Sequence, residues 1–491
     1  MPAYYLEAFT VILGIVLLMI EAFGPSHSKK AVGISAAAGL AAILVLLFFA
    51  KGPSEEAAFA PIWQNFYQFD GLARFYKGFA LVCTALVILM SIDFRSVLSR
   101  FTDHPESESG TGEFYALPVF ACAGMMWMAS AKDLAGAFVA LELVTITFYI
   151  LVAYMRRNVG SLEAGVKYLI LGALSTGFLV YGIAWIYGAT GTMNLAEIGA
   201  KLGGLESTTP LLFGVGLILV ALGFKIGAVP MQVWIPDVYQ GAPTPTTAFL
   251  SVGSKAAGFI LLIRFLTPIM ENGSEIVVNS VKIMLLVMAG ATVIFGNFAA
   301  IAQSNFKRLL AYSSIAHAGF LILALAAWTK GDAEELGSVG AVSFYLATYL
   351  LMTLASFFVL AQIKVQKDSE MIDAFDGLGK RSPMLAVAMT IIMAALAGIP
   401  LTAGFWGKFF VFLLAAQAGL WWGVILAAVG ATAGFYYYFK LIRSMWWNEP
   451  SEASKPFQMP KISSYCVGIL TAAVVILGIW PQPILWLLGS H

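Results

Sequence analysis

The sequence is poor in charged residues. Only 11% of its 491 residues are Asp, Glu, Lys or Arg, whereas soluble proteins average about 25%. Lys and Arg total 28 against 27 Asp and Glu, so there is no basic excess to bind nucleic-acid phosphates. With a 60% apolar composition, this shortage excludes an ordinary soluble enzyme, a disordered chain and a nucleic-acid-binding protein.

Residues that bind cofactors are scarce as well. The three cysteines, Cys83, Cys122 and Cys466, lie far apart in apolar runs, so a zinc site or an iron–sulfur cluster is not expected. Only His317 of the four histidines lies inside an apolar segment, and a membrane haem with two axial histidines needs two. A G-x-x-x-x-G-K-[ST] phosphate loop is missing, which argues against ATP-driven transport. We expect no cofactor in this chain.

Apolar runs are abundant instead. A bilayer-spanning helix needs about 20 apolar residues, and the chain holds about 14 such segments. The predicted spans are 4–23, 31–50, 74–92, 114–130, 134–155, 166–188, 209–235, 245–267, 279–300, 309–329, 341–363, 383–415, 421–443 and 463–487. Because the linkers are too short for a soluble domain, we predict an all-α polytopic membrane protein that forms one membrane domain over 1–491.

The basic residues in the connections and at the adjoining ends of the spans predict the orientation. Seventeen lie in odd-numbered connections and eight in even-numbered ones, so the odd side is predicted to be cytoplasmic and both termini periplasmic. The three remaining lysines, Lys225, Lys255 and Lys408, lie inside apolar runs, as does Glu142.

Two of the predicted spans are unusually long and interrupted. Gly227 and Pro230 interrupt span 7, and Gly398 and Pro400 interrupt span 12. The two spans are five apart, and each break lies close to a buried lysine. A repeat unit of five helices has an odd count, so its second copy must be inverted in the membrane. Interrupted helices at matching positions of inverted repeats indicate an ion pathway near the membrane midplane.

The repeats divide the chain into four parts. We predict three N-terminal helices over 1–113, a first repeat over 114–267, a second, inverted repeat over 279–443, and a C-terminal helix over 463–491.

A charge at the bilayer centre costs about 2.5–3.5 kcal/mol even on a lenient scale, so such a residue usually has a partner or a task. Glu142 can pair with Lys225, either as a fixed packing pair or as a switchable pair whose separation releases the lysine proton. Lys255 has no carboxylate in its own stretch, so it is a relay or a lysine that snorkels to the interface. Lys408 follows a helix break and can bind its exposed carbonyls.

His317 lies about halfway along span 10. It is either a hydrogen-bonded packing residue or a proton relay between two lysines. The neighbouring Tyr312, Ser313 and Ser314 could hold water.

Several other polar residues have a simpler interpretation. Lys307 and Arg308 are predicted to be cytoplasmic anchors. Glu163 and Lys167, four residues apart, favour a surface pair over a point of proton uptake. Asp70 is predicted to cap the start of span 3.

Three blocks of sequence resemble the antiporter-like membrane subunits of respiratory complex I. They are GFKIGAVPMQVWIPDVYQGAPTPTTAFLSVGSKAAGF (223–259), NFKRLLAYSSIAHAGF (305–320) and LAGIPLTAGFWGKF (396–409). The sequences of residues 237–245 and 161–178 are similar to those of the N-type subunit in particular. So is Lys408, because the M-type subunit typically has a carboxylate near that point. The resemblance extends over nearly the whole chain.

The resemblance implies a fold of two inverted five-helix repeats and a proton channel in an NADH:quinone oxidoreductase. It matches Glu142 and Lys225 to the family's Glu–Lys pair, Lys255 to its central relay, His317 to a polar relay position and Lys408 to its exit lysine. It also implies that FMN, the iron–sulfur clusters and quinone are bound by other subunits. The implied partners are an M-type subunit on one side, small K-, J- and A-type subunits on the other, and lipid.

We therefore expect a proton-translocating membrane-arm subunit of the bacterial inner membrane. Quinone reduction elsewhere would separate Glu142 from Lys225, and a proton would pass through Lys255 and His317 to Lys408 and the periplasm. One alternative is a subunit of a cation/proton antiporter of the same fold. Another is a passive scaffold whose buried charges only fix helix packing.

Overall fold

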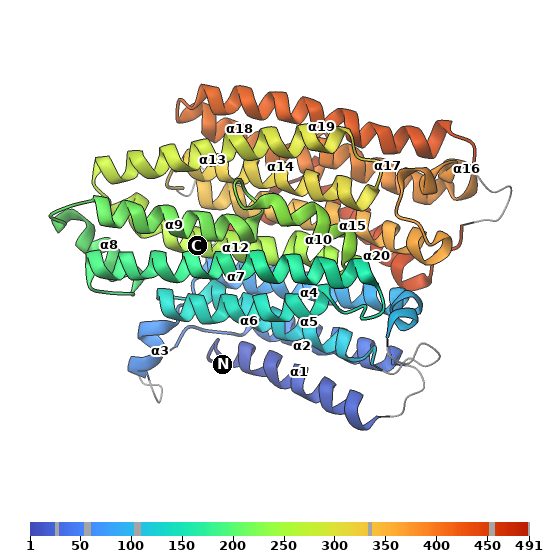
Figure 1. Ribbon diagram of the computed structural model, residues 1–491, viewed down its shortest axis with the longest axis horizontal. Coiled ribbons are helices and arrows are strands. Elements are labelled where there is room, and N and C mark those ends of the chain that lie inside the picture. Colours follow the sequence, from blue (N-terminus) through green and yellow to red (C-terminus); the bar gives the residue numbers. More distant parts are fainter. Residues whose placement is uncertain (25–28, 54–59, 103–109, 332–335, 451–456, 490–491) are drawn as a thin grey trace.

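A computed structural model describes residues 1–24, 29–53, 60–102, 110–331, 336–450 and 457–489. Figure 1 shows long helices lying side by side, with the chain progressing from α1 at one edge to α18 and α19 at the other. The N-terminal part comprises α1 (Tyr5–Phe23), α2 (Lys30–Phe48), the short α3 (Ala60–Phe66) and α4 (Gly71–Leu98).

The segments predicted to form the two repeats follow in chain order. The first contains α5 (Glu113–Ser130), α6 (Leu134–Val152), α7 (Val159–Thr190), α8 (Leu195–Lys201), α9 (Thr209–Ile226), α10 (Ile235–Gly241), α11 (Thr244–Phe249) and α12 (Lys255–Asn272). The second contains α13 (Glu275–Ile301), α14 (Phe306–Ala326), α15 (Ser338–Lys367), α16 (Leu378–Arg381), α17 (Pro383–Ala397), α18 (Ala403–Gln417) and α19 (Trp421–Trp447). The chain continues through α20 (Lys461–Ile479) and α21 (Gln482–Gly489).

The all-helical membrane architecture is confirmed, but the count of 14 spans is not. Within the described residues, twelve helices are long and apolar enough to cross a membrane. The two other predicted spans, 114–130 and 383–415, correspond to α5 and to the broken pair α17–α18, which do not meet that criterion.

Both predicted helix breaks are present. α9 ends at Gly227, where φ is 80°, and α17 ends at Gly398, where φ is 92°. Only glycine adopts these left-handed values without steric cost, which explains why each helix stops there. Span 7 resumes as the short α10 and span 12 as α18. The fold thus has a discontinuous helix at the same position of each repeat.

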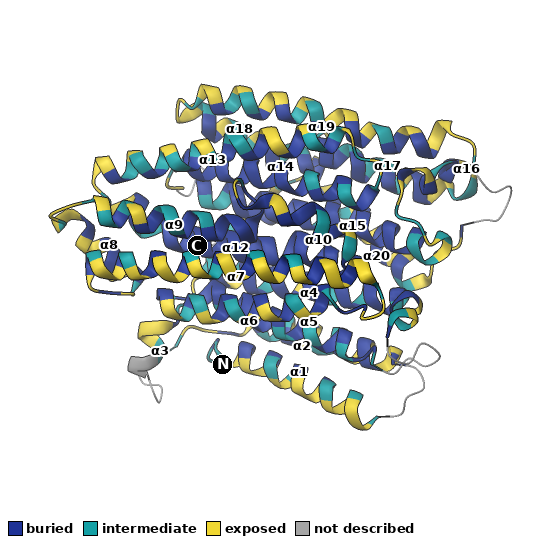
Figure 2. Cartoon of the chain, viewed as in Figure 1, coloured by how far each residue is buried: buried dark blue, intermediate teal, exposed yellow. Residues whose placement is uncertain are grey.

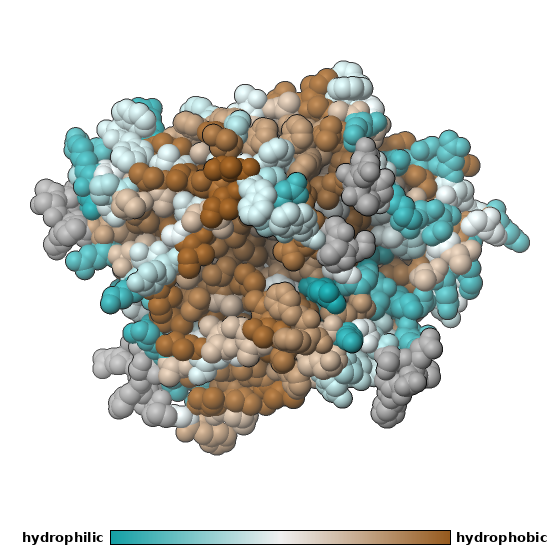
Figure 3. All heavy atoms as spheres, turned by 180° about the vertical axis from the view of Figure 1, so that it is seen from behind, coloured by the Kyte–Doolittle hydropathy of each residue, from teal (hydrophilic) through white to brown (hydrophobic). Residues whose placement is uncertain are grey.

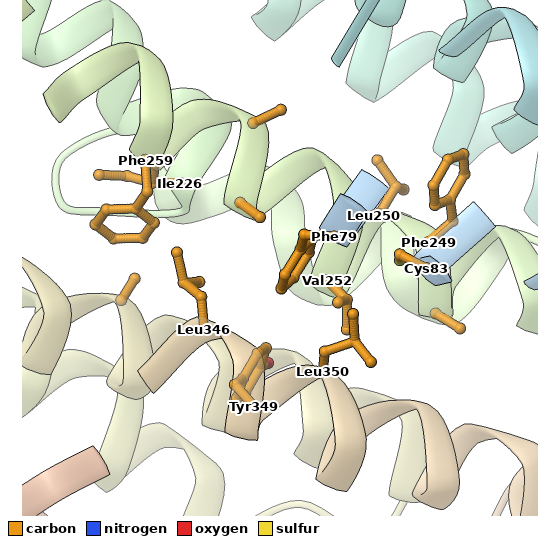
Figure 4. Close-up of a cluster of buried hydrophobic side chains, with 14 of the residues drawn as sticks. Phe79, Cys83, Ile226, Phe249, Leu250, Val252, Phe259, Leu346, Tyr349 and Leu350 are labelled. Carbon is orange, nitrogen blue, oxygen red and sulfur yellow. The ribbon is translucent and has the colours of Figure 1, made fainter. Parts of the chain in front are cut away.

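A third irregularity was not predicted from the sequence. The backbone between α11 and α12, Leu250–Ser254, forms a π-helix directly before Lys255. Figure 4 shows Val252 of this segment in a dry cluster with Phe79 of α4 and Leu350 of α15. Lys255 therefore begins α12 directly after a buried apolar segment.

The core lies around three central segments. Residues 244–266, from α11 into α12, are buried throughout, and the most apolar parts of α14 and α15 are almost wholly buried, whereas only about a third or less of the corresponding parts of α1, α2 and α7 is buried (Figure 2). The exposed outer faces are apolar, and seen from behind, hydrophilic side chains gather toward the two ends of the molecule (Figure 3). This is the pattern of a protein whose flanks face lipid.

Several basic residues counted in the connections are in fact buried, among them Lys77 and Arg264. Lys77 lies inside α4 and forms an ion pair with Glu7 of α1, and the Tyr67 hydroxyl contacts both. Arg264 lies inside α12 and donates to both carboxylate oxygens of Asp70 at 2.6 Å. Asp70 also caps α4 as predicted, by accepting from the Ala73 N–H at 2.8 Å.

Candidate functional site

Lys225 and Glu142 lie in the first repeat but do not touch. Lys225, in the last turn of α9, donates to the Thr145 hydroxyl of α6. Glu142, one turn earlier on α6, accepts from the Thr176 hydroxyl of α7 at 2.8 Å. Among the described residues no carboxylate lies within ion-pair distance of Lys225. The two predicted partners are therefore separated here. Thr145 of α6 binds Lys225, and Thr176 of α7 binds Glu142.

Lys255 occupies the centre of the molecule. It begins α12 and donates to the backbone carbonyl and the hydroxyl of Ser314 on α14. The Tyr349 ring of α15 lies 5.4 Å from its Nζ. With 2% of its surface exposed, Lys255 does not snorkel to an interface.

His317 is held by two tyrosine hydroxyls. Its Nδ1 lies 2.6 Å from Tyr345 of α15, and its Nε2 lies 3.0 Å from Tyr438 of α19. The Tyr349 ring, which faces Lys255, lies 5.0 Å from the His317 ring. Tyr349 thus bridges the space between the central lysine and the histidine.

Lys408 is bound to the end of a broken helix. It extends from α18 and donates to the carbonyls of Leu396 at 2.9 Å and Ala397 at 2.7 Å, at the C-terminus of α17. These carbonyls have no partner within the helix, and the helix dipole favours a cation there. The predicted contact between Lys408 and the broken turn is confirmed. Phe320 of α14 lies beneath the ammonium, 5.6 Å away.

One face of α14 connects these groups. Ser314, His317 and Phe320, each three residues apart, face Lys255, the tyrosine pair and Lys408 in turn. Residues at this spacing lie one above the other on a helix. The lysines and His317 are predicted from the sequence, whereas Tyr345, Tyr349 and Tyr438 are not. A tyrosine in an apolar run carries no signal of its own, because it packs equally well as an ordinary core residue.

A polar cavity of about 340 Å³ opens at the predicted cytoplasmic end. We call it the chamber, and its lining includes Lys167, Asp237, Thr244, Lys307 and Glu370. Lys307, predicted to be a surface anchor, is buried instead and lies 3.0 Å from Glu370. Its aliphatic stem is covered, and a carboxylate from the loop after α15 neutralises its charge.

The chamber's rim carries a fixed carboxylate. Asp237 accepts from Lys167 at 2.9 Å and from Arg308 at 2.8 Å. Burial works to raise the pKa of Asp237, but these two hydrogen bonds outweigh it and hold the pKa below its usual value. Glu163 and Lys167 form the predicted exposed pair, at 2.8 Å.

Metal ligation is not supported by this arrangement. Within the part of the chain that the structure describes, no group of three or more His, Cys, Asp or Glu side chains could hold a metal ion. Lys225, Lys255, His317 and Lys408 carry groups that can bind and release protons.

Comparison with known proteins identifies the family. Residues 131–434 match the family described as NADH:quinone oxidoreductase/Mrp antiporter, TM. The chain is 39% identical to NADH-quinone oxidoreductase subunit N of Heliobacterium modesticaldum, over 97% of this chain and 96% of that protein.

Solved structures agree with this relationship. A chain of respiratory complex I from Thermus thermophilus superposes with a TM-score of 0.77 at 32% identity, covering 97% of each chain. A chain of the Mrp complex from a Dietzia species has a TM-score of 0.80 at 19% identity, over 99% of this chain and 96% of that one, and shows the shared fold. The chain belongs to the NADH:quinone oxidoreductase/Mrp antiporter family of membrane proteins, and within it to the NADH-quinone oxidoreductase subunit N group.

Proposed function

We propose that the chain conducts protons through Lys225, Lys255, His317 and Lys408 as a membrane-arm subunit of NADH:quinone oxidoreductase. The observation that carries the proposal is a difference between two sets of buried cations. The four relay residues are at most 8% exposed, and in the described part of the chain they contact only hydroxyls, carbonyls and rings.

The other buried cations have carboxylate partners. Lys77 pairs with Glu7, Arg264 with Asp70, Lys307 with Glu370 and Lys29 with Glu21. Burial without a counter-charge disfavours the charged form of a lysine, so the proton can leave. A carboxylate partner has the opposite effect. The unpaired set is therefore suited to exchange protons, and the paired set to hold helices together.

The separated Glu142 and Lys225 supply the switch. Their present partners, Thr176 and Thr145, are neutral, and a hydrogen bond to a charged group is worth about 1.5–3 kcal/mol, so each bond costs less to exchange than a buried ion pair costs to break. Contact between the two charges would hold a proton on Lys225, and separation would release it toward Lys255. In this proposal residues 114–267 contain the switch and the central lysine, and residues 279–443 contain His317 and the exit at Lys408.

The same proposal includes the orientation of the chain in the membrane and its neighbouring subunits. The termini and the exit face the periplasm of a bacterial inner membrane, in keeping with the distribution of basic residues. The M-type subunit lies on one side and the small K-, J- and A-type subunits on the other. Electron transfer takes place in other subunits, which bind FMN, the iron–sulfur clusters and quinone. An independent cation/proton antiporter of the same fold is not favoured, because the subunit N relative matches almost the whole chain.

The test is Lys225→Ala in the assembled complex. We expect NADH-driven proton pumping by reconstituted vesicles to fall, and quinone reduction with it, because the two are coupled. Lys380→Ala, which removes an exposed lysine paired with Glu449, is the control and should leave both unchanged. If pumping and quinone reduction are intact in Lys225→Ala, the relay assignment is wrong.

A further inference from the structure

The step from His317 to Lys408 is the last one inside the proposed relay. A pump must prevent protons from returning along the path by which they leave, because the membrane potential drives charges back across the membrane. A barrier to return is therefore needed before the exit, and the contacts of His317 and Lys408 show which residue provides it.

His317 and Lys408 make their hydrogen bonds to different groups. The two ring nitrogens of His317 contact the hydroxyls of Tyr345 and Tyr438. The ammonium of Lys408 donates to two carbonyls at the end of α17. Among the described residues, no hydrogen bond joins Lys408 to His317 or to either tyrosine. In this arrangement a proton has no hydrogen-bonded route between the two.

Phe320 lies against both of them. The centre of its ring is 6.1 Å from the centre of the His317 ring, with the two planes at 80°, and 5.6 Å from Nζ of Lys408. The ring of Phe412, from α18, packs against it at 6.1 Å. Phe320 is 2% exposed. Because a phenyl ring has no hydrogen-bonding group and excludes water, it interrupts proton transfer where it lies.

The contact with Lys408 depends on the charge of the lysine. An ammonium over the face of an aromatic ring is attracted by the ring quadrupole, and this attraction is strongest where water is absent. A neutral amine carries no charge for the quadrupole to attract. Phe320 is joined to α14 by rotatable side-chain bonds, so its ring can leave this position without movement of the helix. The ring is therefore held against Lys408 when the lysine is protonated and is released when it is not.

We propose that Phe320 is a valve whose position follows the charge of Lys408. The inference rests on the proposed function. When Lys408 is neutral, the ring turns aside, and the His317 imidazolium gives a proton to the lysine amine, so that one N–H bond breaks and another forms. Lys408 is then an ammonium, and the ring closes against it. The way back to His317 is blocked while the proton is at the exit, and its release to the periplasm frees the ring again.

The experiment measures passive proton leak through the whole complex in vesicles without NADH. A potassium gradient with valinomycin sets the membrane potential, and a pH-sensitive dye follows proton movement. We expect Phe320→Ala to raise the leak and to lower the number of protons pumped per NADH, while quinone reduction continues. Pentafluorophenylalanine at position 320 keeps an apolar ring of similar size but reverses its quadrupole. It should raise the leak on the order of tenfold, as the loss of a desolvated cation–π contact predicts.

Two controls separate the valve from a general effect of a cavity or of fluorination. Phe357 of α15 is as deeply buried as Phe320 but has no printed contact with the relay lysines or His317. Phe357→Ala and pentafluorophenylalanine at position 357 should both leave the leak at the native rate. Native gels establish that every variant assembles, and leak is expressed per assembled complex.

The outcomes distinguish this inference from the function on which it rests. A native leak rate in Phe320→Ala overturns the valve, and so does a native rate with the fluorinated ring, because the ring then does not respond to charge. A leak in Phe320→Ala that persists when Lys255→Met is added also overturns it, since the opened path is then not the relay. Normal pumping by Lys255→Met alone refutes the relay itself.

Discussion

At the scale of single residues, the informative property is what neutralises a buried charge. Lys307 and Lys408 are both buried lysines, yet one has a carboxylate and the other has only carbonyls. From the sequence alone, Lys307 is predicted to be a cytoplasmic anchor, but in the structure it is buried and paired with Glu370. Its partner Glu370 lies 63 residues away in the chain, so local context gave no sign of the pairing.

Lys408→Arg separates the structural role of this residue from proton transfer. Arginine can keep the hydrogen bonds to the α17 carbonyls but does not release its proton in proteins. We expect normal assembly with pumping reduced on the order of a hundredfold. Lys440→Arg is the control, since Lys440 binds a single carbonyl, that of Gln303, outside the relay. Pumping by Lys408→Arg at the control rate would contradict the exit role.

Asp237 should make the α10 segment sensitive to acid. Its folded pKa lies below the usual value, chiefly because the hydrogen bonds from Lys167 and Arg308 outweigh the effect of burial. The stability that it contributes is therefore complete above the unfolded pKa of about 3.9 and is lost as pH falls through the lower folded value. Amide hydrogen exchange over 227–241, corrected for intrinsic rates, should show protection that falls as the pH is lowered through this range. In Asp237→Asn the protection should be weaker throughout and should not show this fall. Identical pH profiles for the two proteins would contradict the assignment.

At the scale of elements, the breaks could be predicted and the π-helix could not. Gly227 and Gly398 each precede a proline by a few residues, and these residues interrupt a helix by their own backbone chemistry. The π-helix over Leu250–Ser254 has no such residue pattern. Its Val252 packs with Phe79 of α4 and Leu350 of α15 (Figure 4), and contacts with such distant helices are not encoded in the local sequence.

Gly398→Ala tests the importance of the break in span 12. A left-handed alanine costs about 1–2 kcal/mol, and its Cβ would lie 2.9 Å from the Lys408 side chain. We expect a lower melting temperature of the complex and slower pumping, because Lys408 must shift. Gly216→Ala is the matched control, since its Cβ meets nothing within 4 Å and alanine favours a helix. Equal melting temperatures for the two variants would show that the left-handed turn is not required.

At the scale of the whole molecule, the chain is a membrane-arm subunit of NADH:quinone oxidoreductase. One ion pair joins α1 to α4 within its N-terminal part, and another joins the start of α4 to α12. The partners of these pairs are distant in sequence: Glu7 and Lys77 are 70 residues apart, and Asp70 and Arg264 are 194 apart. The count of basic residues by connection includes Lys77 and Arg264 and gives no sign of either pairing. Repeats and breaks can be read locally, whereas pairings between distant helices emerge only from the folded arrangement.

The pair of Glu7 and Lys77 provides the last test, because it should stabilise the fold without conducting protons. Lys77→Met alone leaves a buried carboxylate without its counter-charge and should cost about 3–5 kcal/mol. The double variant Glu7→Leu with Lys77→Met removes both charges and should recover most of that loss, as replacement of a whole buried pair by apolar residues is often neutral. Thermal unfolding of the purified complex measures both effects. The double variant should also pump at the normal rate. If it is stable and pumps poorly, carboxylate-paired cations also take part in conduction, and the distinction between paired and unpaired cations does not mark the proton path.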